Sequence, residues 1–390
     1  MQKPPIAIVG LGVFAALCGL LPLSYLFLRL FEGLEKALAE LLRPRTIELL
    51  ANTLLLTVSV TVTAVIIGSF QAWLTTRTNL FAAAFFAVLG TLPLAIPSYV
   101  LALAYSSVLP WFSGFFAAWL TLSVVTAPYV FLAVSAALAR SNVAQEEVAR
   151  SLGLSRFQVL TKVTWPQVRT AAMASGLLVA LYTLSEFGAV SILRFDTFTR
   201  AIYNAYRGSF DRTAAAALAV VLVVLTLLVL YFEKRYRSDY TRVEKQAKQP
   251  RINLGAWRYL IGLGLVLLAA VSVFVPVTAL VLWSSNASSW DLGQIFEALT
   301  VSLSIASLAG AVIGVFAIAV ALWNVRFSSR FASGVELTIW SSHALPGLVV
   351  ALALVFFGAN LTPGIYQTVW LLLIAYLILF LPNALSVVTT

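Results

Sequence analysis

Long apolar segments recur along this 390-residue chain, and they restrict its fold more than any other feature. Hydrophobic residues make up 61% of the sequence and charged residues only 10%, whereas a soluble globular domain carries about 25% charged residues. Backbone amides find no water inside a bilayer, so a crossing segment must satisfy its hydrogen bonds as a helix of about 20 residues. The sequence therefore predicts an all-α polytopic membrane protein.

Ten apolar segments are long enough to span a bilayer. We expect them at residues 6–30, 49–75, 81–107, 117–140, 171–194, 212–232, 257–283, 298–325, 331–358 and 365–388. The first is longer than the core of a signal peptide and has no convincing cleavage site beside it, so we interpret it as a spanning helix.

The distribution of Lys and Arg predicts the orientation of these helices. A cytoplasmic N-terminus places 17 of the 25 basic residues inside and 8 outside, as the positive-inside rule requires. The basic linker 236–256 would then lie in the cytoplasm against anionic lipid headgroups. This location explains the net charge of +10 without a nucleic-acid partner.

Similar segments recur about 250 residues apart, which indicates an internal duplication. NTLLLTVSVTVTAVIIG at 52–68 is echoed by LTVSLSIASLAGAVIG at 299–314, Pro97 by Pro346, and Pro128 by Pro382. We predict a first half at 1–235, the linker, and a second half at 257–390. The second copy of the polar loop described next would fall beyond Thr390, so the second half is expected to be incomplete.

One polar loop, residues 142–166, separates two of the apolar segments and has the signals of a helix-turn-helix. Asn142 with Gln145, and Ser155 with Gln158, are expected to cap two short helices. Gly153 can take the left-handed conformation that ends the first of them. Pro166 is expected to break or kink the chain before the next membrane helix. Apolar residues at helical spacing would form one face of the second helix: Phe157, Leu160, Val163 and Thr164.

The same loop resembles the "EAA" loop of ATP-binding-cassette (ABC) importer permeases, in which glycine follows the acid by six positions and proline by nineteen. The matching residues are Glu147, Ala149, Gly153 and Pro166, with departures at Val148 and Trp165. The resemblance implies a duplicated type I importer (MetI-like) permease fold. It also implies that the turn inserts into a groove of a cytoplasmic ABC ATPase dimer, with Glu147 stabilising the loop. The inserted residues would be Arg150, Ser151, Leu152, Gly153 and Leu154.

Two further segments, LSEFGAVSIL and DTFTRAIYNAY, resemble ferric iron permeases of the binding-protein-dependent type, and in part thiamine, sulfate and polyamine permeases. That resemblance implies a bacterial inner (plasma) membrane location and a periplasmic or extracellular solute-binding protein as partner. It implies neither catalysis nor a cofactor. No GxxxxGK[ST] motif occurs in the chain, so ATP hydrolysis would belong to a separate subunit.

Glu186 is the one acid expected deep inside a span, and we predict Tyr182 and Ser175 on the same helical face. An ionised carboxylate there costs about 2.5–3.5 kcal/mol on insertion scales, so it must face protein or water. It would either line a translocation path or anchor neighbouring helices. The alternative function is a secondary transporter or channel that uses Glu186 as its ion site. One cysteine and one histidine, His343, leave no set of metal ligands.

Overall fold

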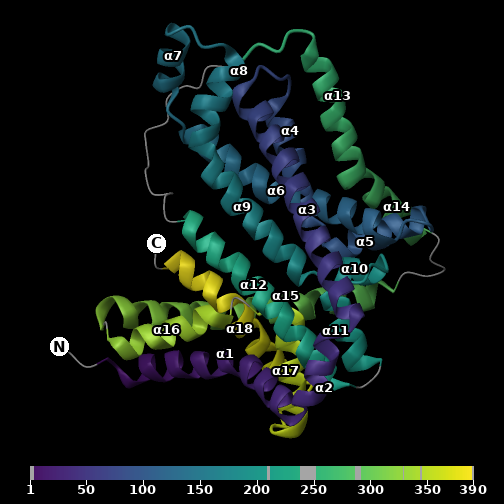
Figure 1. Ribbon diagram of the computed structural model, residues 1–390, viewed down its shortest axis with the longest axis vertical. Helices are drawn as coiled ribbons and strands as arrows, with labels where there is room; N and C mark the ends of the chain where they lie inside the picture. Colours follow the sequence, from purple (N-terminus) through teal and green to yellow (C-terminus); the bar gives the residue numbers. More distant parts are fainter. Residues whose placement is uncertain are drawn as a thin grey trace. The chain divides into compact units, whose positions relative to one another are not determined.

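The computed structural model describes residues 4–208, 211–237, 252–285, 291–327, 329–342 and 345–388. Helices account for the regular structure of these residues (Figure 1). The one other element described is a β-bridge between Thr78 and Ile252. In chain order they are α1 (Ile6–Glu32), α2 (Leu34–Leu41), α3 (Pro44–Arg77), α4 (Ala83–Thr91), η1 (Leu92–Ala95), α5 (Ser98–Val108), α6 (Gly114–Arg140), α7 (Val143–Ser151), α8 (Arg156–Val159), η2 (Leu160–Thr164), α9 (Trp165–Ser185), α10 (Gly188–Ile192), α11 (Phe198–Arg207), α12 (Arg212–Arg237), α13 (Trp257–Ala269), η3 (Ala270–Phe274), α14 (Val275–Ser285), α15 (Leu292–Arg326), α16 (Arg330–Ser342), α17 (Gly347–Asn360) and α18 (Val369–Val388). The turn η1 is a 3-10 helix, and η2 and η3 are π-helical turns. The predicted all-α class is confirmed.

Within the described ranges, eight helices are long and apolar enough to cross a membrane, and two bent helix pairs raise the number to ten. The bends are 93° between Ala83–Ala95 and Ser98–Val108, and 107° between α16 and α17. The segments expected at 81–107 and 331–358 are thus each a pair of helices joined at a sharp bend. Pro97 and Pro346 stand before the second helix of each pair, with ψ of 141° and 140°. Each proline is the N-cap residue of the second helix, a position where its missing amide hydrogen leaves no helical hydrogen bond unmade.

The helices pack as two units that do not follow the order of the chain. The first unit is Met1–Thr46, Ala201–Leu227 and Ala287–Thr390, and the second is Ile47–Arg200 and Leu228–Asn286. Helix α1 thus packs with α15–α18, whereas α13 and α14 pack with α4 and α5. The opening helix of each predicted half lies among helices of the other half. The division into halves itself stays a prediction.

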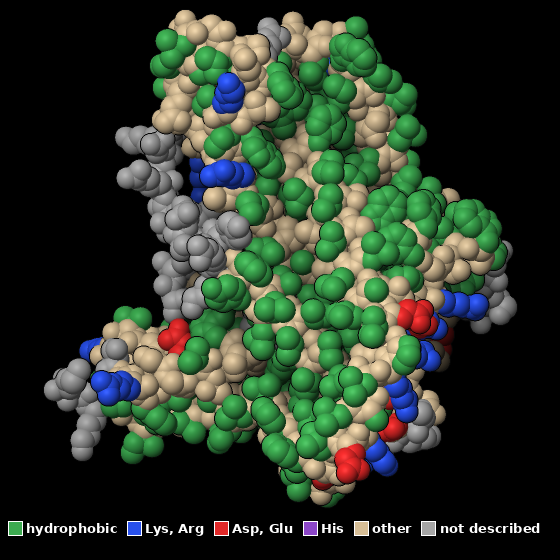
Figure 2. Space-filling model, in the orientation of Figure 1, with side chains coloured by type: hydrophobic (Ala, Val, Ile, Leu, Met, Phe, Trp, Pro, Cys, Tyr) green, Lys and Arg blue, Asp and Glu red, His purple; other side chains and the backbone are tan. Residues whose placement is uncertain are grey.

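In the second unit, helix α3 has one buried face and one exposed apolar face that is suited to lipid. Leu56, Val60 and Ala64 lie in the main core of the unit. One turn further, a Cβ on Gly68 would approach the Ala127 carbonyl oxygen of α6 to 2.6 Å, so only glycine allows this close packing. The opposite face carries a stripe of exposed apolar side chains: Val58, Val62, Ile66 and Phe70. Hydrophobic side chains likewise dominate the face shown in Figure 2, as expected of a surface in contact with lipid.

The helix run α13–η3–α14 is attached to α5 through a π-helical turn. Pro276 has no amide hydrogen, so acceptors in the preceding turn need other donors. The Tyr105 hydroxyl donates to one of these, the Val271 carbonyl, at 2.6 Å. This bond fixes the middle of the run to α5 within the second unit.

The first unit has its own core around Trp323 of α15. A Cβ on Gly12 of α1 would approach the Trp323 ring to 2.7 Å, so the indole lies directly on the backbone of α1. The Ser342 hydroxyl contacts the Ile378 carbonyl of α18 at 3.0 Å. His343 lies outside the described residues, as do 238–251 of the basic linker.

Candidate functional site: the loop between α6 and α9

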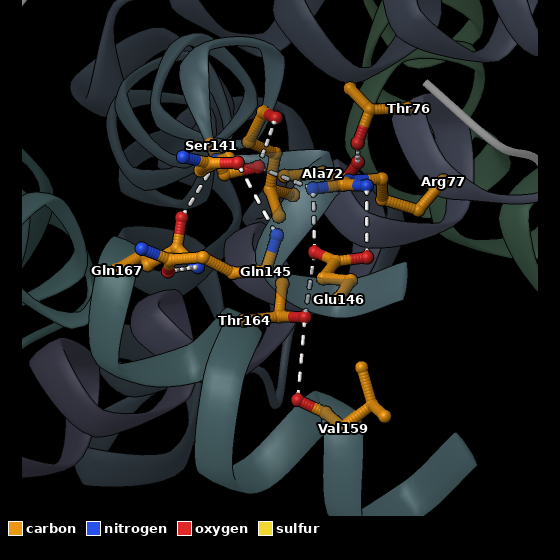
Figure 3. Close-up of polar contacts among 11 residues, drawn as sticks. Ala72, Thr76, Arg77, Ser141, Gln145, Glu146, Val159, Thr164 and Gln167 are labelled. Carbon is orange, nitrogen blue, oxygen red and sulfur yellow. Dashed lines mark hydrogen bonds and ion pairs between the residues drawn. The ribbon is translucent and has the colours of Figure 1, made fainter. Parts of the chain in front are cut away.

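The 142–166 loop begins with a capped helix. The Asn142 side chain accepts a hydrogen bond from the Gln145 amide at 3.3 Å, which satisfies one of the free amides at the start of α7. The Gln167 side chain accepts from the Asn142 amide at 2.8 Å and donates to the Gln145 side chain at 3.2 Å. The predicted cap is confirmed, and Gln167 of α9 ties it down (Figure 3).

Gly153 makes the turn between the two helices of the loop. Its φ is +86°, in the region that glycine adopts without strain. The Leu154 amide donates to the Ala149 carbonyl at 3.1 Å and the Gly153 amide to the Arg150 carbonyl at 3.0 Å, closing the C-terminus of α7. Ser155 and Gln158 exchange hydrogen bonds of 2.9 and 3.3 Å as the predicted capping box. The helix-turn-helix is confirmed.

The second helix of the loop runs into the membrane without a break. Phe157–Ser185 forms one candidate span, in which the π-helical turn η2 precedes Pro166. Of the break or kink expected at Pro166, the break is therefore absent. Proline occupies the first turn of α9, and the wider π turn accommodates the missing amide hydrogen. A movement of the loop would consequently reach α9 directly.

A buried ion pair joins the loop to α3. Arg77, the last residue of α3, donates from Nη2 to Glu146 Oε1 at 2.9 Å and from Nη1 to Oε2 at 3.3 Å (Figure 3). Both side chains are buried, with 3% and 6% of their surfaces exposed. Two parallel, charge-assisted bonds fix both distance and orientation. The loop is thus held against α3 by a specific geometry.

Hydroxyl groups extend this ion pair to two more helices. Arg77 Nη2 also donates to the Ser141 hydroxyl at the end of α6. The Thr164 hydroxyl of η2 donates to Glu146 Oε1 at 2.9 Å. We call these four residues, Arg77, Ser141, Glu146 and Thr164, the loop lock. It joins α3, α6, α7 and η2 in one corner of the second unit.

Glu147, which the family resemblance implied would stabilise the loop, is exposed and has no hydrogen-bond or ion-pair partner among the residues that the structure describes. Glu146 and Ala149 are three positions apart and share the buried face of α7, so the intervening Glu147 is turned to solvent. The acid that stabilises the loop is therefore Glu146.

The outer surface of the loop presents apolar side chains beside charged ones. Val148, Leu152 and Phe157 are 58%, 74% and 73% exposed. Glu147, Arg150 and Ser151 are also exposed. Phe157 was predicted on the same face as Thr164, but Thr164 is buried and Phe157 is not.

Glu186 lies at a break between helices rather than inside one. Helix α9 ends at Ser185, and the Glu186 carboxylate accepts from the Ser98 hydroxyl at 2.9 Å and from the Ala189 amide at 2.9 Å. The Tyr182 side chain interacts with both Ser98 and Glu186. Ser175 instead donates within its own helix, to the Ala171 carbonyl at 2.7 Å. The structure thus brings Tyr182 to Glu186, and the residue that sequence reasoning missed there is Ser98.

These contacts predict the effect of removing only the charge of Glu186. In Glu186→Gln the amide oxygen still accepts from Ser98 or Ala189, so we expect the unfolding temperature and substrate uptake to stay close to wild type. Thermal unfolding and vesicle uptake would be measured together. Lost uptake at unchanged stability would instead assign the carboxylate charge to the translocation path.

The described residues contain no group of three or more His, Cys, Asp or Glu side chains that could hold a metal ion. The features that the structure does describe in this region are the exposed tip of the loop, the loop lock and the continuous helix from Phe157 to Ser185.

Comparison with known proteins identifies the family. Residues 64–238 match the model described as binding-protein-dependent transport system inner membrane component. The Fe(3+)-transport system permease protein FbpB 2 of Haemophilus influenzae is 36% identical over 98% of this chain and 78% of its own length. The chain belongs to the binding-protein-dependent transport permeases. Other relatives of this permease are the sulfate transport system permease protein CysT of Escherichia coli, 27% identical over 59% of this chain and 91% of that protein, and the probable ABC transporter permease protein y4fN of Sinorhizobium fredii, 26% identical over 89% of this chain and 70% of that protein.

Family membership confirms the resemblance found in the sequence. The permease is a multi-pass membrane subunit of an ABC importer, and such a subunit works with an ATPase and a solute-binding protein. Family membership therefore favours the importer over the alternative of a secondary transporter or channel that uses Glu186 as its ion site.

Proposed function

We propose that this permease carries ferric iron across a bacterial inner membrane, driven by a cytoplasmic ABC ATPase dimer that grips the 142–166 loop. The iron assignment is supported chiefly by the extent of the similarity to the Haemophilus influenzae protein, which covers nearly the whole chain. The similarity to the sulfate permease CysT covers only 59% of the chain. Sulfate is therefore the second candidate substrate.

The docking role of the loop is supported by its shape and surface. Leu152 and Gly153 lie at the exposed tip, between two capped helices, and Val148 and Phe157 add apolar surface on either side. A rigid, partly apolar projection suits insertion into a groove of another protein. We propose that Arg150, Ser151, Leu152, Gly153 and Leu154 enter the ATPase, and we call residues 142–166 the coupling loop hereafter.

The mechanism follows from the connection of the coupling loop to α9. Closure of the ATPases around ATP would move the loop, and the uninterrupted helix from Phe157 to Ser185 would carry that movement into the membrane. A loaded binding protein would dock on the opposite side, and the cytoplasmic N-terminus expected from the basic residues is consistent with this orientation.

Reconstitution tests this proposal. Proteoliposomes containing the permease and its ATPase, supplied with ferric-loaded binding protein, are expected to take up radioactive iron only with ATP and to be insensitive to a protonophore. Ser151→Cys, made in a Cys18→Ser background because Cys18 is the one native cysteine, should crosslink to the ATPase. Uptake of sulfate instead of iron in the same vesicles would assign sulfate as the substrate. Failure of the crosslink would reject the docking role of the loop.

A further inference from the structure

The last residues of α3 hold two segments that come from distant parts of the chain. The Arg77 guanidinium holds Glu146 of the coupling loop, while the Arg77 carbonyl accepts from the Ile252 amide at 2.7 Å. Ile252 lies just before α13, the helix that opens the predicted second half. One residue therefore bonds to the coupling loop with its side chain and to the approach to α13 with its backbone.

Asn79 strengthens the second of these connections. Its amide donates to the Ile252 carbonyl at 3.0 Å, and its side chain donates to the Asn253 side chain at 2.9 Å and accepts from the Leu254 amide at 2.9 Å. Together with the Arg77 carbonyl, this gives four hydrogen bonds between 77–79 and 252–254. We call this set the α13 clamp.

We propose that Arg77 is the positioning residue through which the coupling loop moves α3 and α13 together. The inference rests on the proposed docking of the coupling loop to the ATPase. Because the loop lock is buried and bidentate, the loop cannot tilt away from α3 without breaking charge-assisted bonds. Because the α13 clamp starts at the same residue, α13 must follow. One coupling loop would then drive membrane helices from both predicted halves.

Arginine is required for this role because of the shape of its head group. Its two Nη atoms reach both oxygens of Glu146, and Nη2 also reaches Ser141. Lysine keeps the positive charge but offers a single point donor. In Arg77→Lys the negative charge of Glu146 is therefore still compensated, but the two parallel hydrogen bonds that orient the coupling loop against α3 are lost.

Iron uptake per ATP hydrolysed is the first readout. We expect the Arg77→Lys permease still to crosslink to the ATPase through Ser151→Cys. The ATPase should still hydrolyse ATP, while iron uptake falls about tenfold. Arg140→Lys is the matched control, because Arg140 is exposed at the end of the neighbouring helix α6; it should transport like wild type. Thr164→Val, which removes the hydroxyl that donates to Glu146 at 2.9 Å and lies 3.5 Å from the Val159 carbonyl, should also lower uptake.

Spin-label distances test the joint movement directly. Lys162 in the π-helical turn η2 is exposed, and Trp257 at the start of α13 is 68% exposed, so both accept labels as cysteines. In the otherwise native Cys18→Ser protein, we expect the distance between them to stay constant when ATP binds. In Arg77→Lys and in Asn79→Ala the distance distribution should broaden.

Two results would overturn the proposal: a change of the native distance upon ATP binding, or normal uptake per ATP by Arg77→Lys. Neither outcome would affect the docking role, which fails separately if Ser151→Cys does not capture the ATPase.

Discussion

Glu146→Leu is expected to destabilise the permease by about 3–5 kcal/mol, because Arg77 would keep its charge in a buried site without a counter-ion. Ser141 would remain as its hydrogen-bond partner, which cannot compensate a full charge. Thermal unfolding of the purified protein in detergent would report the effect as a lower Tm. We expect iron uptake to be lost as well, since the coupling loop would no longer be held against α3.

Glu147→Leu is the matched control, one position along the same helix. Glu147 is exposed, so its replacement should change stability by no more than about 0.5 kcal/mol. The double variant Arg77→Met with Glu146→Leu should recover most of the lost stability, because apolar residues of similar volume often replace a buried ion pair at little cost. Equal Tm values for Glu146→Leu and Glu147→Leu would show that the ion pair does not stabilise the fold.

Gly153→Val is expected to abolish uptake by changing the direction of the coupling-loop tip. A side chain at Gly153 meets no atom within 4 Å, so the effect would come from the backbone alone. At a φ of +86° a residue with a Cβ is strained by about 1–2 kcal/mol. The turn would relax, the two hydrogen bonds that close α7 would break, and the tip would no longer fit the ATPase. Crosslinking from Ser151→Cys and iron uptake would measure both effects.

Gly114 offers a control with the same strain in a different place. Its φ is +79°, nothing lies within 4 Å of an added Cβ, and it is the first residue of α6, at the opposite end of that helix from the coupling loop. Gly114→Val should therefore lower the Tm by a similar amount while the crosslink persists. Gly153→Asn should retain uptake, because asparagine tolerates the left-handed conformation. If Gly153→Val still crosslinks to the ATPase, the docking role assigned to this turn is wrong.

Local features of the coupling loop could be predicted from its sequence because their causes are local. The two caps join residues three positions apart, and the conformation of Gly153 follows from its own lack of a side chain. Chain length and hydropathy likewise predicted the spans. The sharp bends at Pro97 and Pro346 could not be distinguished from mild kinks, because proline is also tolerated inside membrane helices and neighbouring helices decide between the two outcomes.

The loop lock could not be predicted, since Arg77 and Glu146 are 69 positions apart and meet only when α3 and α7 have packed. A partial signal was present. Glu146 shares a helical face with Ala149, the position that matched the family pattern, and Arg77 is the one basic residue at the end of its span. To predict that the two residues pair, one must know which helix ends lie side by side. The apolar surfaces of membrane helices do not predict this.

The exchange of opening helices has a consequence for assembly. Helix α1 completes the bundle of α15–α18, and the α13–α14 run completes the bundle built by earlier helices. The first bundle cannot close during synthesis until α15–α18 have been inserted, and the second cannot close until α13 and α14 have been inserted. Were the gene divided at the basic linker, each product would carry a segment that its counterpart lacks, and the two would become obligate subunits of a heterodimer.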